Sequence, residues 1–186
     1  MTKFLHASDL HLAKPFGRFD EDLRVRLREA RHEKISVMAE VARANGVKIA
    51  LLAGDTFDAE TPSPQVVRHA MRAFAAESDI TWYILPGNHD SIAAGDLWDR
   101  MSRDCPENVV LVLDPAPIAV GEDAVILPAP PTSKSPGRDL TEWMDQAELG
   151  DMSDRIRIGL AHGSIRDFGE DGSTANGVIP PDRPRL

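Results

Sequence analysis

Polar side chains that can bind metals recur in this sequence at the ends of short apolar runs. Asp9 and His11 follow the first run, and their spacing of two residues would place both on one side of an extended backbone. A carboxylate and an imidazole presented together suit a borderline metal such as Mn, Fe or Zn. Taken alone, however, the Asp-X-His triplet fits a capped turn with a surface histidine better than it fits a metal site.

The strongest apolar run, residues 49–53, reads IALLA and ends at Gly54 and Asp55. Its length and composition predict a strand that is buried on both faces. Asp55 would then stand at the carboxyl end of that strand, where ligands collect in open α/β sheets. Considered alone, a Gly-Asp turn that caps the next segment explains this pair equally well.

A third run, residues 81–85, leads into Gly-Asn-His-Asp at 87–90, and a fourth, 155–161, ends at His162. The tetrapeptide by itself could be a hydrogen-bonded turn, because Asn and Asp favour such positions. Successive strands of a βαβαβ pattern, however, would bring all of these strand ends to one edge of a sheet. A turn alone therefore explains the recurrence poorly.

Amphipathic helices are predicted between these runs. Residues 22–45 repeat apolar side chains at a spacing near 3.6, with a buried stripe predicted at Leu23, Leu27, Ala30, Met38 and Ala42. Ser63 is predicted to cap a second helix that begins at Pro64 and runs to about Glu77. The alternation predicts an α/β protein with a βαβαβ core, in which a sheet sandwich is flanked by helices.

The later part of the sequence is less regular. Short helices are predicted at 97–101 and 140–149, a strand at 109–113, and a hairpin from 118–120 and 124–127. Trp143, in the second of these helices, is expected to pack against the domain. We predict one domain over residues 1–168 and an irregular Gly- and Pro-rich tail over 169–186.

Composition limits the class of protein. The chain has 186 residues with a formal net charge of −9, and it contains no apolar run of about 18 residues, so a membrane span and a secretory signal are not expected. The single Cys105 fits a reduced cytoplasmic setting, as a small apolar residue near a turn. The acidic charge argues against passive electrostatic binding of nucleic acid, although acids in a metal site would account for part of that charge.

The strand ends together provide two carboxylates, two imidazoles and one amide oxygen. This mixture of nitrogen and oxygen ligands indicates a hydrolytic metal rather than a thiolate site. Two metals about 3.5 to 4 Å apart need a carboxylate between them, and Asp55 on the central strand suits that position. His89 is then left to stabilise charge or to protonate a leaving oxygen. The predicted ligands are Asp9, His11, Asp55, Asn88 and His162.

The order and spacing of these motifs resemble those of the calcineurin-like metallophosphoesterases. The matching blocks are Asp9-X-His11, Gly54-Asp55-X-X-Asp58, Gly87-Asn88-His89-Asp90 and His162-Gly163. The resemblance implies that Asp9 and His11 bind one metal, Asn88 and His162 the other, and Asp55 both. It further implies that His89 is the catalytic acid and that Asp58 orients it.

Within that superfamily, the residues that flank the motifs are most similar to SbcD-type DNA repair nucleases. The similarity rests on Leu-His-Ala-Ser-Asp-Leu-His at 5–11 and on Gly-Asp-Thr-Phe-Asp at 54–58. It implies a DNA exonuclease or endonuclease that uses two divalent metals, with Mn favoured and Fe, Zn or Mg as alternatives. It also implies an ATPase partner.

The sequence departs from the family pattern at its end. The family closes with a further histidine motif, and no histidine follows His162 here. We therefore expect an incomplete phosphoesterase domain that lacks the C-terminal part of its second sheet. We expect it to bind metals weakly, to turn over slowly or not at all, and to self-associate through an exposed apolar face. Two other functions stay open: a phosphodiesterase or phosphatase acting on a small nucleotide, which suits the acidic charge, and a binding module without turnover.

Overall fold

A parallel four-stranded sheet forms the centre of the protein. The computed structural model describes residues 1–165 and 178–179. The strands are β1 (Leu5–Ala7), β2 (Ile49–Ala53), β3 (Thr81–Leu85) and β4 (Val109–Leu111), in that spatial order. All three pairings are parallel, so the carboxyl ends of the strands lie along one edge.

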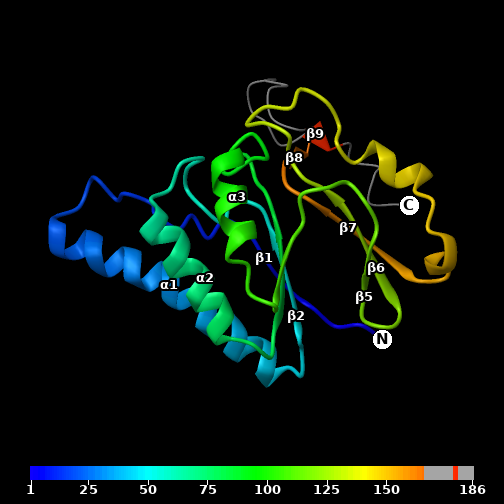
Figure 1. Cartoon of the computed structure of the whole chain (residues 1–186), viewed down its shortest axis with the longest axis horizontal. Coiled ribbons are helices and arrows are strands. Elements are labelled where there is room, and N and C mark those ends of the chain that lie inside the picture. Colours follow the sequence, from blue (N-terminus) through cyan, green and yellow to red (C-terminus); the bar gives the residue numbers. More distant parts are fainter. Residues whose placement is uncertain (166–177, 180–186) are drawn as a thin grey trace.

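Three helices connect these strands and cover one face of the sheet, as Figure 1 shows. They are α1 (Glu21–Ala44), α2 (Pro64–Ala76) and α3 (Gly95–Arg103). Ser63 caps α2 as predicted, because its hydroxyl accepts a hydrogen bond from the N–H of Val66. Among the described residues, no helix is long and apolar enough to cross a membrane.

A second sheet packs on the opposite face of the first (Figure 1). It contains β5 (Ile118–Val120), β6 (Ala124–Ala129) and β7 (Ile156–Ala161), with β5 and β6 antiparallel as the predicted hairpin requires. β6 and β7 are parallel. This confirms the predicted layered α/β fold of a sheet sandwich flanked by helices.

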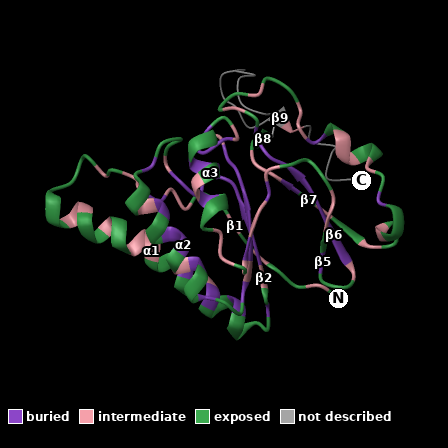
Figure 2. Ribbon diagram, viewed as in Figure 1, coloured by how far each residue is buried: buried purple, intermediate pink, exposed green. Residues whose placement is uncertain are grey.

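The alternating side chains of β2 explain why its sequence is apolar throughout. Ala50 and Leu52 belong to the core beneath the helices, whereas Leu51 and Ala53 belong to the core between the two sheets. All four are buried, as the colouring of Figure 2 makes visible along this strand. The predicted double-faced burial is therefore confirmed.

Burial of α1 is concentrated in its second half. Ile35, Ala39 and Ala42 are buried, whereas Leu23 and Leu27 of the predicted stripe are only half-buried. The first turns of α1 lie farthest from the sheet in Figure 1, which limits what they can pack against. The helix therefore has its predicted length, but of the predicted stripe only Ala42 is buried, and Ala30 and Met38 are half-buried like Leu23 and Leu27.

The predicted helix at 140–149 is replaced by two short 3-10 segments, η1 (Glu142–Gln146) and η2 (Gly150–Met152). Both the N–H and the hydroxyl of Thr141 donate to the carboxylate of Asp139, at 2.8 and 2.6 Å, so Thr141 does not cap a helix. Trp143 packs with its neighbours against the outer face of β6, as expected.

A further short strand lies within the segment predicted to be an irregular tail. β9 (Val178–Ile179) pairs in parallel with β8 (Ser164–Ile165). Pairing of this kind depends on a partner distant in sequence, which a two-residue strand does not signal by its own pattern. The rest of the predicted tail lies outside the described residues.

Candidate metal centre

The loops that follow β1 and β2 run side by side along the carboxyl edge of the first sheet. The N–H of Asp9 donates to the carbonyl of Gly54 at 3.1 Å, and the N–H of His11 donates to that of Asp55 at 2.9 Å. The backbones of Asp9, His11 and Asp55 all have positive φ, at 60°, 44° and 54°. Non-glycine residues rarely adopt this backbone conformation, and it is concentrated at functional sites.

The carboxylate of Asp55 lies at the centre of the site and is 3% exposed. Its Oδ1 accepts the backbone N–H of His89 at 2.9 Å. Its Oδ2 lies 3.5 Å from Nε2 of His162 and 3.9 Å from Nε2 of His11. Loops from β1 and β3 of the first sheet and from β7 of the second thus converge on one acid.

Two groups of potential metal ligands share this acid. One is His11, Asp55 and His89, and the other is Asp9, Asp55 and His162, with the ligand atoms of each group within 4.8 Å of one another. Asp9 is thus grouped with His162, although its Oδ1 is also only 3.5 Å from Nε2 of His11.

Asn88 completes the set, because its Oδ1 lies 2.9 Å from Nε2 of His162. The structure therefore brings together all five ligands predicted from the sequence. The predicted acid, His89, lies beside them, and one of its ring nitrogens is within 4.8 Å of the potential ligand atoms of His11 and Asp55.

The surroundings of the His162 ring favour a positive charge at the carboxyl edge of the first sheet. Its Nδ1 lies 2.8 Å from the carbonyl of Ala53, and because a carbonyl can only accept, Nδ1 carries a proton. Nε2 then faces the oxygens of Asn88 and Asp55. A neutral imidazole would present a lone pair to these acceptors, so a proton or a metal cation between them is favourable. The donor set therefore fits a divalent metal.

The pKa values of this pair agree with that interpretation. Burial alone would lower the pKa of His162, but its contacts with Asp55 and with the Ala53 carbonyl outweigh burial and raise it. Burial alone would raise the pKa of Asp55, but the hydrogen bonds and charges of His162 and His89 outweigh it and lower the pKa. Asp55 is consequently an ionised carboxylate at neutral pH, as a bridging ligand must be.

Asp58 contacts both His11 and His89, but through different atoms. Its carboxylate Oδ1 lies 3.0 Å from Nδ1 of His11 and 3.3 Å from Nζ of Lys14. Its backbone carbonyl lies 3.1 Å from Nδ1 of His89. The contact of Asp58 with His89 is therefore made by the main chain, and its carboxylate lies within ion-pair distance of His11 without a hydrogen bond to Nδ1.

Asp90 is a site residue whose role the sequence patterns did not reveal. Its fully buried carboxylate accepts the N–H of Gly87 at 2.6 Å and that of Phe57 at 2.9 Å, which ties the loop after β3 to the loop after β2. Burial raises the pKa of Asp90 to about 6, against the opposing effect of the two N–H groups. The sequence feature that could have indicated this role is an acid directly after Asn88 and His89.

Two glycines are required by close approach at the site. A Cβ on Gly87 would overlap the carboxylate and the backbone nitrogen of Asp55. A Cβ on Gly54 would overlap the ring of His162, and Gly54 also has φ +87°. Gly54 and Gly87 thus allow the ligands of different loops to meet.

The site opens into a cavity of about 340 Å³ whose lining includes Asp9, Asn88 and His162. Pro131 and Lys134, from the segment after β6, form another part of the wall. A lysine facing a cluster of ligands suits an anionic substrate.

Comparison with known proteins agrees with this geometry. The model of the calcineurin-like phosphoesterase family matches residues 2–178. The chain is also similar to a protein named "Uncharacterized metallophosphoesterase YhaO" from Bacillus subtilis (strain 168), with 33% identity over 111 residues. That alignment covers 57% of this chain and 26% of the relative, so the chain spans about a quarter of the relative's length. The family match over nearly the whole chain shows that the protein belongs to the calcineurin-like phosphoesterases, a family of metal-dependent phosphoester hydrolases.

Proposed function

We propose that this protein is a two-metal phosphodiester hydrolase that acts on DNA, with Mn²⁺ as the favoured metal. The observation that carries the proposal is Asp55, a buried carboxylate shared by two groups of potential ligands. A carboxylate in this position allows two cations to lie within a few ångströms of each other.

Each ligand has a role in this proposal. Asp9 and His11 would hold one metal, Asn88 and His162 would hold the other, and Asp55 would contact both. When bound, a metal pair would lower the pKa of a water molecule and neutralise charge on the oxygens of a phosphoryl group. Gly87 and Asp90 keep the loops after β2 and β3 close together, and Gly54 makes room for the ring of His162 from the second sheet.

His89 is proposed to protonate the leaving oxygen. Its Nδ1 faces the Asp58 carbonyl at 3.1 Å, so Nδ1 carries a proton and Nε2 is the nitrogen left to exchange one with substrate. Replacing it by glutamine tests this role. We expect His89→Gln to bind the same number of metals as the parent and to lose about 10²–10⁴-fold in kcat. A reduced metal stoichiometry in His89→Gln would instead make His89 a ligand.

DNA as substrate is supported by the resemblance of the flanking residues to SbcD-type nucleases. A small nucleotide is the second candidate, favoured by the net charge of −9. An ATPase partner, a cytoplasmic setting and self-association remain predictions. Ile156 at the start of β7 is 48% exposed and offers apolar surface for self-association.

The two-metal assignment is tested by calorimetric titration with Mn²⁺. We expect two ions to bind the parent chain and Asp55→Asn to lose both, because the bridging charge is removed. The matched control is Asp99→Asn, which makes the same chemical change on the exposed side of α3 and should leave both sites intact. Absence of Mn²⁺ binding by folded parent protein would contradict the proposal.

The substrate is tested by comparing hydrolysis of linear DNA with hydrolysis of a small chromogenic diester, both with Mn²⁺. Faster turnover of DNA supports the nuclease, and turnover of the small diester alone supports the small-nucleotide enzyme. If folded, metal-loaded protein hydrolyses neither compound, the protein is a binding module without turnover.

A further inference from the structure

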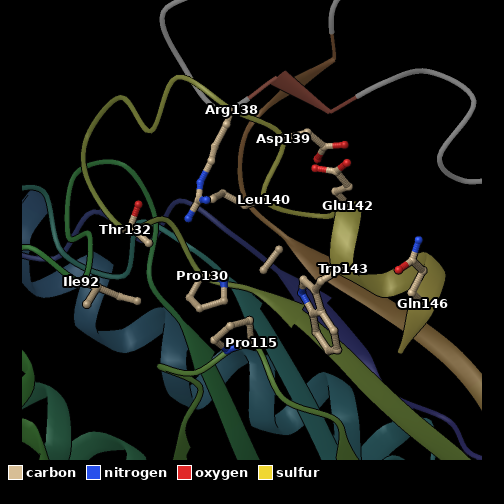
Figure 3. A pocket seen from close by; sticks show the side chains of 11 residues that line it. Ile92, Pro115, Pro130, Thr132, Arg138, Asp139, Leu140, Glu142, Trp143 and Gln146 are labelled. Carbon is tan, nitrogen blue, oxygen red and sulfur yellow. The ribbon is translucent and has the colours of Figure 1, made fainter. Parts of the chain in front are cut away.

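A second cavity, of about 460 Å³, lies beside the metal edge between the segment after β6 and η1 (Figure 3). Its apolar lining includes Ile92, Pro115, Pro130 and Trp143. Figure 3 shows the two proline rings and the indole of Trp143 gathered on its lower side. A cavity of this size and character suits a small planar organic group.

One short segment separates this cavity from the site. Pro130 and Thr132 line the second cavity, whereas Pro131, between them, lines the cavity that contains Asp9, Asn88 and His162. The carbonyl of Pro131 accepts the N–H of Ile92 at 3.0 Å, which attaches the segment to the loop that carries His89. Only this segment would therefore separate a molecule held in the second cavity from the cavity that contains the predicted metal ligands.

The indole of Trp143 is held in place for stacking. Its Nε1 donates to the carbonyl of Pro128 at 3.1 Å, and the ring is half-buried. The other two tryptophans, Trp82 and Trp98, are 0% and 3% exposed and belong to the core. Trp143 is thus the tryptophan that can offer a ring surface to a ligand, and a fixed aromatic ring beside proline rings suits a nucleobase.

The charged groups define how such a ligand would lie. Arg138 extends from the upper rim down towards Thr132 and Leu140 in Figure 3. Its guanidinium lines the cavity, and a guanidinium can bind a phosphate through two parallel N–H groups. Asp139 and Glu142, also on the lining and side by side in Figure 3, would repel a phosphate placed beside them. The polar groups therefore favour a phosphate near Arg138 and an uncharged base against Trp143.

We propose that this cavity binds a nucleoside of the substrate, with its base stacked on Trp143 and a phosphate held by Arg138. The inference rests on the proposed function and deepens it, because it adds to the metal site a neighbouring pocket that would hold the base and a phosphate of the substrate. It assigns specificity to Trp143 and Arg138, neither of which lies among the metal ligands.

Binding is tested without metal, so that the result does not depend on catalysis. In EDTA, equilibrium dialysis would compare deoxyadenosine 5′-monophosphate with ribose 5-phosphate. We expect the nucleotide to bind at least about tenfold more tightly, because stacking on an aromatic ring requires the base. Trp143→Leu should lose that preference, and Trp143→Phe should keep most of it. Phe19→Leu, which removes an exposed aromatic ring just before the start of α1, is the matched control and should bind as the parent does.

Arg138→Gln separates the phosphate contact from the stacking contact. We expect this variant to bind the nucleotide several-fold more weakly and to bind deoxyadenosine unchanged. Equal binding of the nucleotide and ribose 5-phosphate, or parent-like nucleotide binding by Trp143→Leu, would overturn the proposal.

A kinetic comparison distinguishes failure of this site from failure of the proposed function. With Mn²⁺, thymidine 5′-(p-nitrophenyl phosphate) and methyl p-nitrophenyl phosphate share a leaving group and differ in the nucleoside. We expect Trp143→Leu to raise KM about tenfold for the thymidine diester and to leave kcat/KM for the methyl diester within twofold. If the parent hydrolyses neither diester yet binds the nucleotide through Trp143, the nucleoside site stands and the hydrolase proposal fails. If Trp143→Leu weakens hydrolysis of both diesters equally, the nucleoside site is wrong.

Discussion

The four-stranded sheet is covered on both faces, by helices on one and by the second sheet on the other, whereas the three-stranded sheet packs against short 3-10 turns on its outer face. The two sheets also contribute unequally to the site. Loops after β1, β2 and β3 supply four of the five predicted ligands, and β7 supplies only His162.

The predicted ligands of the first sheet are held by main-chain hydrogen bonds between neighbouring loops and by the buried carboxylate of Asp90. His162 is held by its contact with the Ala53 carbonyl and by the packing of the two sheets. We infer that one half of the site is built into a single sheet, and that the other half depends on how two sheets dock.

Gly87→Ala should have the largest effect, because it damages the first-sheet half directly. The new methyl group would overlap the backbone and carboxylate of Asp55. We expect the free energy of unfolding to fall by about 3 kcal/mol or more, and Mn²⁺ binding to be lost. Urea unfolding and calorimetry measure the two effects. The control is Gly95→Ala in α3, where the new Cβ meets nothing within 4 Å, and it should be neutral or slightly stabilising. Similar stability of the two variants would contradict the assigned clash.

Leu160→Ala tests the dependence of His162 on sheet docking. Leu160 is 3% exposed in the core between the sheets, and its truncation should cost about 2–3 kcal/mol. Ile84→Ala removes a fully buried side chain from the core beneath the helices, at comparable cost. We expect Leu160→Ala to weaken Mn²⁺ binding more than Ile84→Ala in protein that remains folded. Equal weakening of Mn²⁺ binding by the two variants would mean that the position of His162 does not depend specifically on the docking of the two sheets.

Gly54→Ala acts at the junction between the two halves. Its positive φ costs about 1–2 kcal/mol for an alanine, and the methyl group would push against the ring of His162. We expect a folded protein in which the affinity of one Mn²⁺ ion falls much more than that of the other, as measured by calorimetry. Equal loss at both sites would show that Gly54 acts through Asp55 instead.

The smallest effect concerns the helical layer, which lies far from the second sheet. The rings of His32 on α1 and His69 on α2 stack at 4.1 Å with 9° between their planes. Burial, and then the charge of His69, lower the pKa of His32 from 6.5, so the folded state favours the neutral ring. The stabilising contribution of His32 is therefore present above pH 6.5 and is lost as the pH falls below that value.

His32→Phe keeps a stacked ring and removes this titration. Urea unfolding at pH 7.5 and 5.5 should show that the parent loses more stability on acidification than the variant does. The buried carboxylates titrate in both proteins and cancel in the difference. The same pH dependence in parent and variant would contradict the role of His32.

Much of the architecture follows from local patterns. The strand at 81–85 has its predicted bounds, and the helix that begins at Pro64 has its predicted cap. These features depend on neighbours within a few residues, such as the alternation of a strand or the hydroxyl of Ser63 at a helix start. The replacement of the predicted helix at 140–149 and the pairing of β9 depend on distant contacts, and local patterns did not indicate them.

The sequence by itself determined which side chains stand at strand ends, since apolar runs followed by Asp, Asn and His are readable without knowing where the strands lie. The tertiary structure decided how those side chains meet: that Asp55 lies between two ligand groups, that the carboxylate of Asp58 contacts His11 while its carbonyl contacts His89, and that Asp90 ties two loops together. The reason is that strand formation is a local property, whereas the distance between atoms of separate loops is set by the packing of sheets and helices around them.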